Sequence, residues 1–204
     1  IHLAGDDSPR ELVLPVPGEH MALNALAALI AVRDYGGDVS EALEALTHFG
    51  GVNRRFQYHG HVGGIRVYDD YAHHPTEARA VLTAAREVAD ADAQGLGHPG
   101  RVIVCFQPHL FSRTEQFAEE FAKALDLADY AIVLDIYGAR EKPIPGVTSE
   151  LITTQLTIPH KYQPDFSKVP YDVAAIAEPG DIVLTMGAGN VTMEADAVIA
   201  LLKG

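Results

Sequence analysis

The sequence predicts an α/β fold with a mostly parallel sheet and helices on both faces. Three runs are almost wholly apolar, at residues 101–106, 130–136 and 181–186. Continuous apolar runs of this kind are typical of parallel strands that are buried on both sides. Each of them, like the shorter run 65–68, is followed by a stretch with the spacing of an amphipathic helix. Four strand-to-helix units in succession therefore indicate parallel crossover connections.

The first quarter of the chain has a different pattern. Residues 1–17 are predicted to be β-rich. Residues 20–35 have helical spacing and are apolar nearly all round, so this helix is expected to be buried on most sides. Asp38, with Glu41 three residues later, resembles a capping box that opens a short helix ending near Phe49.

Gly50-Gly51 marks the expected domain boundary, which divides the chain into domains 1–49 and 50–204. Beyond it, residues 56–61 and 65–68 are predicted to form a hairpin that turns at two further glycines.

The remaining elements follow in alternation. In order, the patterns predict a helix at 76–89, a polar loop containing glycine, a strand at 101–106, a helix from 112, a strand at 130–136, helices at 149–156 and 172–177, a strand at 181–186, and a helix at 191–202. Ser112 with Glu115 forms a second apparent capping box, and Asp172 is a candidate N-cap.

Composition excludes several classes of protein. The chain has 15 basic and 28 acidic residues, a net charge of −13, which repels nucleic acid and anionic membrane surfaces. No apolar run approaches the roughly 20 residues that span a bilayer, and no signal peptide is visible. The single cysteine, Cys105, is expected to be a buried strand residue, which excludes a disulfide scaffold. The missing initiator methionine favours a fragment or a processed chain.

The stretch Tyr68–Thr76 contains two acids, two imidazoles and two phenols between a predicted strand and a predicted helix. Loops at the carboxyl ends of strands are where open α/β sheets bind ligands. Asp69, Asp70, His73 and His74 could form a metal site, although adjacent histidines point in different directions. Two other interpretations stay open. In the first, an aspartate caps the helix and the two histidines are solvated. In the second, the residues contact a ligand: an aspartate accepts hydrogen bonds from ribose hydroxyls, and Tyr71 and His73 lie beside a small polar substrate.

A second polar group follows the strand at 101–106. Gln107, His109 and Arg113 point toward the same edge of the sheet. The planar guanidinium fits a carboxylate through two hydrogen bonds, whereas a surface arginine at a helix start opposes the helix dipole. These residues therefore favour an anion site.

Three further features are ambiguous. Arg54-Arg55 is either a solvated pair on a hairpin or a clamp for phosphate or ribose. Asn24 lies in an apolar helix, where either the backbone satisfies its amide or the amide faces a ligand. Gly187-Ala188-Gly189-Asn190 resembles an anion-binding turn, although close backbone packing explains it equally well. The sequence contains neither a Walker A motif nor a G-x-S-x-G elbow, so these residues alone support neither a free-standing NTPase nor a serine hydrolase.

Together these motifs resemble the carboxyl-terminal part of a Mur ligase. The matching strings, in the order of the family, are Gly18-Glu19-His20-Met21-Ala22-Leu23-Asn24-Ala25, Asn53-Arg54-Arg55-Phe56, Asp69-Asp70-Tyr71-Ala72-His73-His74-Pro75-Thr76, Phe106-Gln107-Pro108-His109, Ser112-Arg113-Thr114, Pro143-Ile144-Pro145-Gly146 and Gly187-Ala188-Gly189-Asn190. The resemblance implies that residues 1–49 are the helical end of a central P-loop ATPase domain. It implies that residues 50–204 are a Rossmann-like domain that binds the amino acid.

The resemblance also implies a reaction. ATP activates the carboxylate of UDP-N-acetylmuramate as an acyl phosphate, which the amine of L-alanine attacks, in the cytoplasmic synthesis of peptidoglycan precursors. Its implied L-alanine contacts are Tyr71, His73, His109 and Arg113, with His73 and Arg113 catalytic. Its implied nucleotide contacts are Asn24, Arg54, Arg55 and Asp69. Mg²⁺ is expected, with ligands mainly in the amino-terminal and central domains, which are also the implied partners.

Two alternatives remain at this point. One is the family member that recycles murein tripeptide onto UDP-N-acetylmuramate, and the other is a metal-dependent hydrolase that uses the Asp/His cluster. The 204 residues alone are expected to be inactive, because half of the implied nucleotide site lies outside them.

Overall fold

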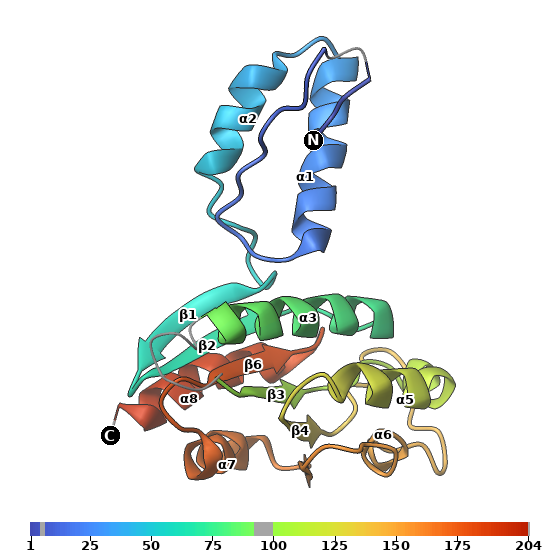
Figure 1. Cartoon of the computed structure of the whole chain (residues 1–204). Coiled ribbons are helices and arrows are strands. Elements are labelled where there is room, and N and C mark those ends of the chain that lie inside the picture. The colour runs from blue at the N-terminus through green and yellow to red at the C-terminus, as the bar shows by residue number, and fades with distance from the viewer. Residues whose placement is uncertain (5–6, 92–99, 204) are drawn as a thin grey trace. The chain divides into compact units, whose positions relative to one another are not determined.

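The computed structural model describes residues 1–4, 7–91 and 100–203. The chain divides into two compact units, Ile1–Val52 and Asn53–Gly204, and each is described by itself (Figure 1). Most of the polar loop expected after the helix at 76–89 lies outside the described residues. The functional assignment of domains 1–49 and 50–204 stays a prediction.

The first unit contains two helices, α1 (Glu19–Asp34) and α2 (Val39–Thr47). The predicted start of α2 is confirmed, because the side chain of Asp38 accepts hydrogen bonds from the backbone N–H groups of Ser40 and Glu41, at 2.7 and 3.3 Å. A small core of Leu3, Leu29 and Val39 lies between the elements.

Two expectations about this unit are wrong. The described residues among the first 17 form no strand; Pro15 and Pro17 cannot donate to a ladder, and a strand needs a paired neighbour. Helix α1 buries only the stripe of Met21, Ala25 and Leu29, while Leu23 is 58% and Ile30 37% exposed. The described residues of this unit cover one face of α1. The apolar composition of a helix does not by itself show how many of its faces pack against other elements.

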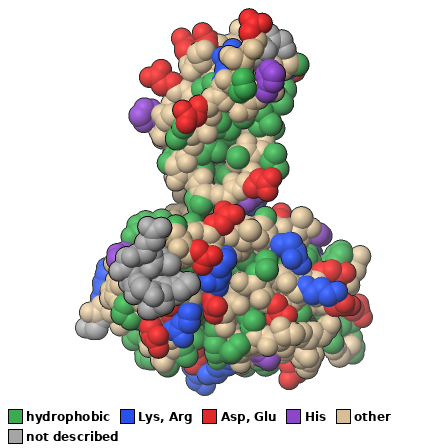
Figure 2. Space-filling model, in the orientation of Figure 1, with side chains coloured by type: hydrophobic (Ala, Val, Ile, Leu, Met, Phe, Trp, Pro, Cys, Tyr) green, Lys and Arg blue, Asp and Glu red, His purple; other side chains and the backbone are tan. Residues whose placement is uncertain are grey.

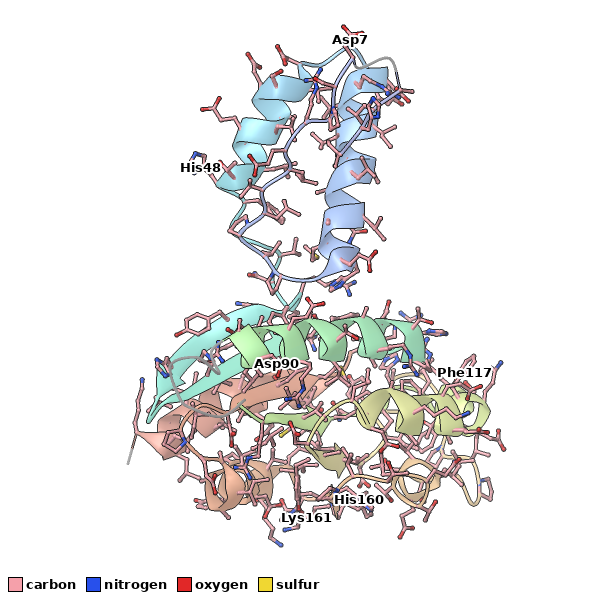
Figure 3. The ribbon with its side chains drawn as sticks, viewed as in Figure 1. Asp7, His48, Asp90, Phe117, His160 and Lys161 are labelled. Atoms are coloured by element: carbon pink, nitrogen blue, oxygen red, sulfur yellow. The ribbon has the colours of Figure 1, made fainter. Side chains whose placement is uncertain are left out.

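The second unit is built on one six-stranded sheet with the strand order β1-β2-β6-β3-β4-β5. Its strands are β1 (Gln57–Val62), β2 (Ile65–Asp70), β3 (Val102–Phe106), β4 (Tyr130–Leu134), β5 (His160–Gln163) and β6 (Ile182–Met186). Strand β1 is antiparallel to β2, and every other pair is parallel. The predicted hairpin and the mostly parallel sheet are confirmed. Strand β5 was not predicted, because a short polar edge strand with His160 and Lys161 exposed lacks the apolar signal (Figure 3).

Helices cover both faces of this sheet, as predicted (Figure 1). Helices α3 (Pro75–Ala91), α5 (Phe111–Leu125) and α6 (Glu150–Thr153) share one hydrophobic core with one face of the sheet. Helices α7 (Val169–Ile176) and α8 (Met193–Leu202) share a second core with the opposite face. Cys105 lies fully buried in this second core, as expected, and burial raises the pKa of its thiol. Two short 3₁₀ turns, η1 (Phe166–Lys168) and η2 (Asn190–Thr192), precede α7 and α8.

Both predicted caps in the second unit are wrong. Ser112 lies inside α5, and its N–H and hydroxyl donate to Glu141 at 2.9 and 2.5 Å. Asp172 lies inside α7 and accepts from Lys161 and Gln163. In both cases a residue distant in sequence is the partner of the polar side chain, so the local spacing was misleading.

Among the helices in the described ranges, none combines the length and the apolar composition that a membrane crossing requires. Acidic side chains are scattered with basic ones over the visible surface of each unit, in keeping with the acidic composition (Figure 2).

Candidate functional site

The polar residues singled out in the second unit gather at one edge of its sheet. Asp69 and Asp70 end β2, Gln107 and His109 follow β3, and the segment 187–190 follows β6. These strands run parallel, so their carboxyl ends meet at the edge where open α/β folds bind ligands.

His73, His109 and Arg113 lie together, as predicted. The Nη1 atom of Arg113 donates to the backbone oxygen of His73 at 3.2 Å and lies 3.4 Å from Nδ1 of His109. The two imidazole rings are 5.7 Å apart, and the ring of Tyr71 is 5.2 Å from that of His73. A guanidinium from α5, two imidazoles and a phenol from the loops after β2 and β3 thus form one group, called here the histidine–arginine cluster.

The charge state of His109 follows from its surroundings. Burial lowers the pKa of His109 first, and the positive charge of Arg113 lowers it further, against a smaller opposite effect of Glu141. His109 is therefore a neutral imidazole at neutral pH. Tyr137 stacks on its ring at 5.8 Å with 20° between the planes, and the backbone of Leu110 donates to Tyr137 O at 2.9 Å.

Sequence reasoning did not single out Tyr137. The available signal was its position directly after the strand predicted at 130–136, where an aromatic ring reaches the same sheet edge as His109.

Asp69 is completely buried and receives three donors. The hydroxyls of Thr185 and Thr192 donate to it at 2.7 and 2.8 Å, and Nε of Arg54 lies at 3.3 Å. Arg54 also donates to the carbonyl oxygens of Gly187 and Gly189, at 2.5 and 3.3 Å. The carboxylate of Asp69 has no exposed surface that could contact a ribose. Asp69 here orients Arg54 instead.

The segment 187–190 is held by Gln107, which is buried. Gln107 donates from Nε2 to the side chain of Asn190 at 3.0 Å and accepts from the N–H of Val191 at 3.1 Å. A Cβ on Gly189 would lie 2.2 Å from Oε1 of Gln107. Close packing therefore accounts for the glycine that the sequence left ambiguous.

The side chains of Asp70 and His74 accept hydrogen bonds from backbone N–H groups. Asp70 accepts from the N–H groups of Phe56 and Ala72, both at 2.7 Å. Nδ1 of His74 accepts from the N–H of Thr76 at the start of α3, and the imidazole ring packs on Phe117 of α5. Within the described residues, no three His, Cys, Asp or Glu side chains are grouped as a metal ion requires. The two carboxylates are engaged by other donors, so the geometry gives the metal-dependent hydrolase no support.

Two of the remaining nucleotide candidates, Arg54 and Arg55, lie beside Tyr71. The guanidinium of Arg54 is 4.6 Å from the ring centre of Tyr71, and that of Arg55, an exposed residue, is 5.9 Å from it. Asn24 belongs to the first unit and its residue is exposed, so the premise that its amide is buried is wrong. The structure leaves the nucleotide roles of these residues as predictions.

The buried carboxyl of Asp70 predicts a pH dependence of stability. Burial raises its pKa from 3.8 to about 6, against the two backbone hydrogen bonds. The folded state thus binds more protons than the unfolded state between these values, so the free energy of unfolding should fall as pH rises from about 4 to about 6. Urea titrations across this range measure how the free energy of unfolding changes with pH. This change should be smaller for D70N than for the unchanged chain, whereas D196N, at an exposed position, should show the same change as the unchanged chain. Equal changes for the chain and D70N would contradict the assignment.

Comparisons with known proteins agree with this geometry. A family model described as "Mur ligase, glutamate ligase domain" matches residues 54–189. A curated relative from Rhodococcus opacus (strain B4), named UDP-N-acetylmuramate--L-alanine ligase, is 56% identical over 98% of this chain and 41% of its own length. A ligase of the same name from Mycolicibacterium smegmatis is 52% identical over the whole chain and 41% of its own length. The chain thus spans about two fifths of the length of the curated relatives that it matches.

Solved structures show the same fold. The crystal structure of a UDP-N-acetylmuramate-alanine ligase from Thermotoga maritima matches with a TM-score of 0.75 and 31% identity, over 94% of this chain and 40% of that one. A murein peptide ligase from Psychrobacter arcticus matches with a TM-score of 0.67 over 95% of this chain and 39% of that one; at 24% identity it supports the fold alone.

Proposed function

Because this chain belongs to the Mur ligase family, we propose that it is the part of an ATP-dependent ligase that receives L-alanine for transfer to UDP-N-acetylmuramate. The observation that carries the proposal is the histidine–arginine cluster, in which Arg113 lies beside His73 and His109. A zwitterionic amino acid needs a cation for its carboxylate and an acceptor for its ammonium group, and the cluster offers both.

The chemistry assigns a role to each member. The carboxylate of UDP-N-acetylmuramate, activated by ATP as an acyl phosphate, is attacked by the alanine amine, and phosphate leaves. The amine attacks only after it has lost a proton, so the reaction needs a base that is close to it. We assign the alanine carboxylate to Arg113 and the amine to His73, with Tyr71 and His109 completing the substrate contacts. Held in this way, the amine and the acyl carbon react as one complex.

ATP and Mg²⁺ are the proposed cofactors. Asn24 in the first unit, and Arg54, Arg55 and Asp69 in the second, remain the proposed nucleotide contacts, with Asp69 acting through Arg54. The described residues do not fit a Mg²⁺ site, because no three of their His, Cys, Asp or Glu side chains are grouped and because Asp69 and Asp70 already accept hydrogen bonds from other donors. The metal ligands are therefore assigned to other parts of the ligase. Those parts and the small-molecule substrates are the proposed partners, in the cytoplasm, where ATP is available.

The murein-tripeptide ligase remains the second candidate within the family. Its representative in the comparisons is 24% identical, against 56% and 52% for the relatives named for L-alanine. Identity over nearly the whole chain therefore favours L-alanine.

The test is phosphate release by the intact ligase that contains these residues, supplied with ATP, UDP-N-acetylmuramate and L-alanine. We expect release with L-alanine and little with murein tripeptide, and no release from the 204 residues alone. Release with tripeptide but not with L-alanine would overturn the proposal.

A further inference from the structure

The Nδ1 atom of His73 lies between two hydrogen-bond acceptors. One is the backbone oxygen of Tyr71 at 3.0 Å, and the other is Oε2 of Glu77 at 3.3 Å. A carbonyl and an ionised carboxylate only accept hydrogen bonds. The proton of the neutral imidazole therefore lies on Nδ1, and Nε2 carries the free lone pair.

We propose that Glu77 is a positioning residue that fixes His73 in this tautomer, so that Nε2 takes the proton of the amino-acid ammonium group. The inference rests on the proposed function and deepens it. The ammonium N–H bond breaks and an Nε2–H bond forms, which gives an imidazolium. The freed amine lone pair then forms the bond to the acyl carbon, and the C–O bond of the acyl phosphate breaks with its electrons leaving on phosphate. The second proton lost by the nitrogen as the neutral amide forms passes to the departing phosphate.

A single carboxylate oxygen holds both the backbone and the ring of His73. Oε2 of Glu77 accepts from the backbone N–H of His73 at 3.0 Å, in addition to facing Nδ1. Glu77 lies in the first turn of α3, four residues after His73, so the helix sets the position of the carboxylate. The side chain of Glu77 is 39% exposed and that of His73 is 24% exposed, so solvent screens their attraction. The contribution of Glu77 is the orientation of the imidazole more than stability.

His109 has the opposite tautomer. Its Nδ1 lies 3.4 Å from Nη1 of Arg113, which only donates. Nδ1 of His109 is therefore an acceptor, and its proton lies on Nε2. Two neighbouring imidazoles thus differ in function: His73 presents an acceptor at Nε2, and His109 presents a donor. Glu77 and Tyr71 O beside Nδ1 of His73, and Arg113 beside Nδ1 of His109, create this difference.

The tautomer is directly measurable on the 204-residue chain. In ¹⁵N-labelled histidine, a two-bond ¹⁵N–¹H spectrum distinguishes a protonated ring nitrogen from an unprotonated one. We expect the protonated nitrogen of His73 to be Nδ1, and E77A to move a measurable part of the population to Nε2, while Tyr71 O remains an acceptor for the rest. The matched control is E87Q, at an exposed glutamate of α3, which should leave the spectrum of His73 unchanged. A proton on Nε2 in the unchanged chain, or no change in E77A, would overturn the proposal.

Kinetics of the intact ligase supply the second measurement. E77Q keeps an acceptor oxygen for the backbone N–H of His73 and removes the charge beside Nδ1. We expect kcat with L-alanine to fall on the order of tenfold, with KM for L-alanine nearly unchanged, because Arg113 still binds the carboxylate. An unchanged kcat would contradict the positioning role. If the ligase does not use L-alanine and the spectra are as expected, the proposed function fails while the tautomer assignment stands.

Discussion

Replacing Arg113 by alanine in the intact ligase is expected to raise the KM for L-alanine about 100-fold and to leave the KM for ATP unchanged. A hydrogen bond to a charged group contributes about 1.5–3 kcal/mol, and each 1.4 kcal/mol changes an affinity about tenfold. Arg113 is close enough to both histidines to act on the same molecule. Its Nη1 atom donates to the backbone oxygen of His73 at 3.2 Å and lies 3.4 Å from Nδ1 of His109. Steady-state kinetics with each substrate varied in turn measure the effect.

Two controls separate recognition of the carboxylate from a general loss of charge. R113K keeps the charge but loses the planar fork that binds both carboxylate oxygens, so it should recover only part of the affinity. R79A removes an exposed arginine from α3 and should change neither KM. Equal increases in the KM for L-alanine and for ATP in R113A would show that Arg113 supports the fold rather than the amino acid.

The sheet could be predicted from the sequence because its signals are local. The runs that form β3, β4 and β6 are apolar at nearly every position, as burial on both faces requires. Parallel strands bring their carboxyl ends to one edge, so His73 and Arg113 could be placed together without any knowledge of loop geometry.

Contacts between distant residues account for most of what the sequence missed. Ser112 bonds Glu141, which is 29 residues away, instead of capping α5. Thr185 and Thr192 hold Asp69. Thr185 lies in β6, where a threonine is an ordinary β-former, so its buried hydroxyl gives no separate signal. The guanidinium of Arg54, a candidate ligand clamp, donates to backbone oxygens of the segment 187–190, and its nucleotide role stays a prediction. Sequence patterns show which residues could bind a ligand and do not show which are already engaged.

D69A should produce the largest loss of stability in the second unit. Asp69 joins β2 to Thr185 on β6, to Thr192 in η2 and to Arg54 before β1. Alanine would remove the acceptor of the Thr192 hydroxyl and of Nε of Arg54, and would leave the Thr185 hydroxyl only its longer hydrogen bond to Tyr68 O, at 3.3 Å. Removing one partner of a buried ion pair typically costs about 3 to 5 kcal/mol.

Urea unfolding followed by near-UV circular dichroism can isolate this unit, because all the tyrosines except Tyr35 lie within residues 53–204. D69N keeps the shape and one acceptor oxygen, so its stability should fall between those of the unchanged chain and D69A. The matched control is D196A, which removes an 83% exposed carboxylate from a surface pair with His59 and should cost no more than about 1 kcal/mol. If D69A proved as stable as D196A, the buried carboxylate would not be holding β2, β6 and Arg54 together. The placement of Arg54 against the segment 187–190 would then need another cause.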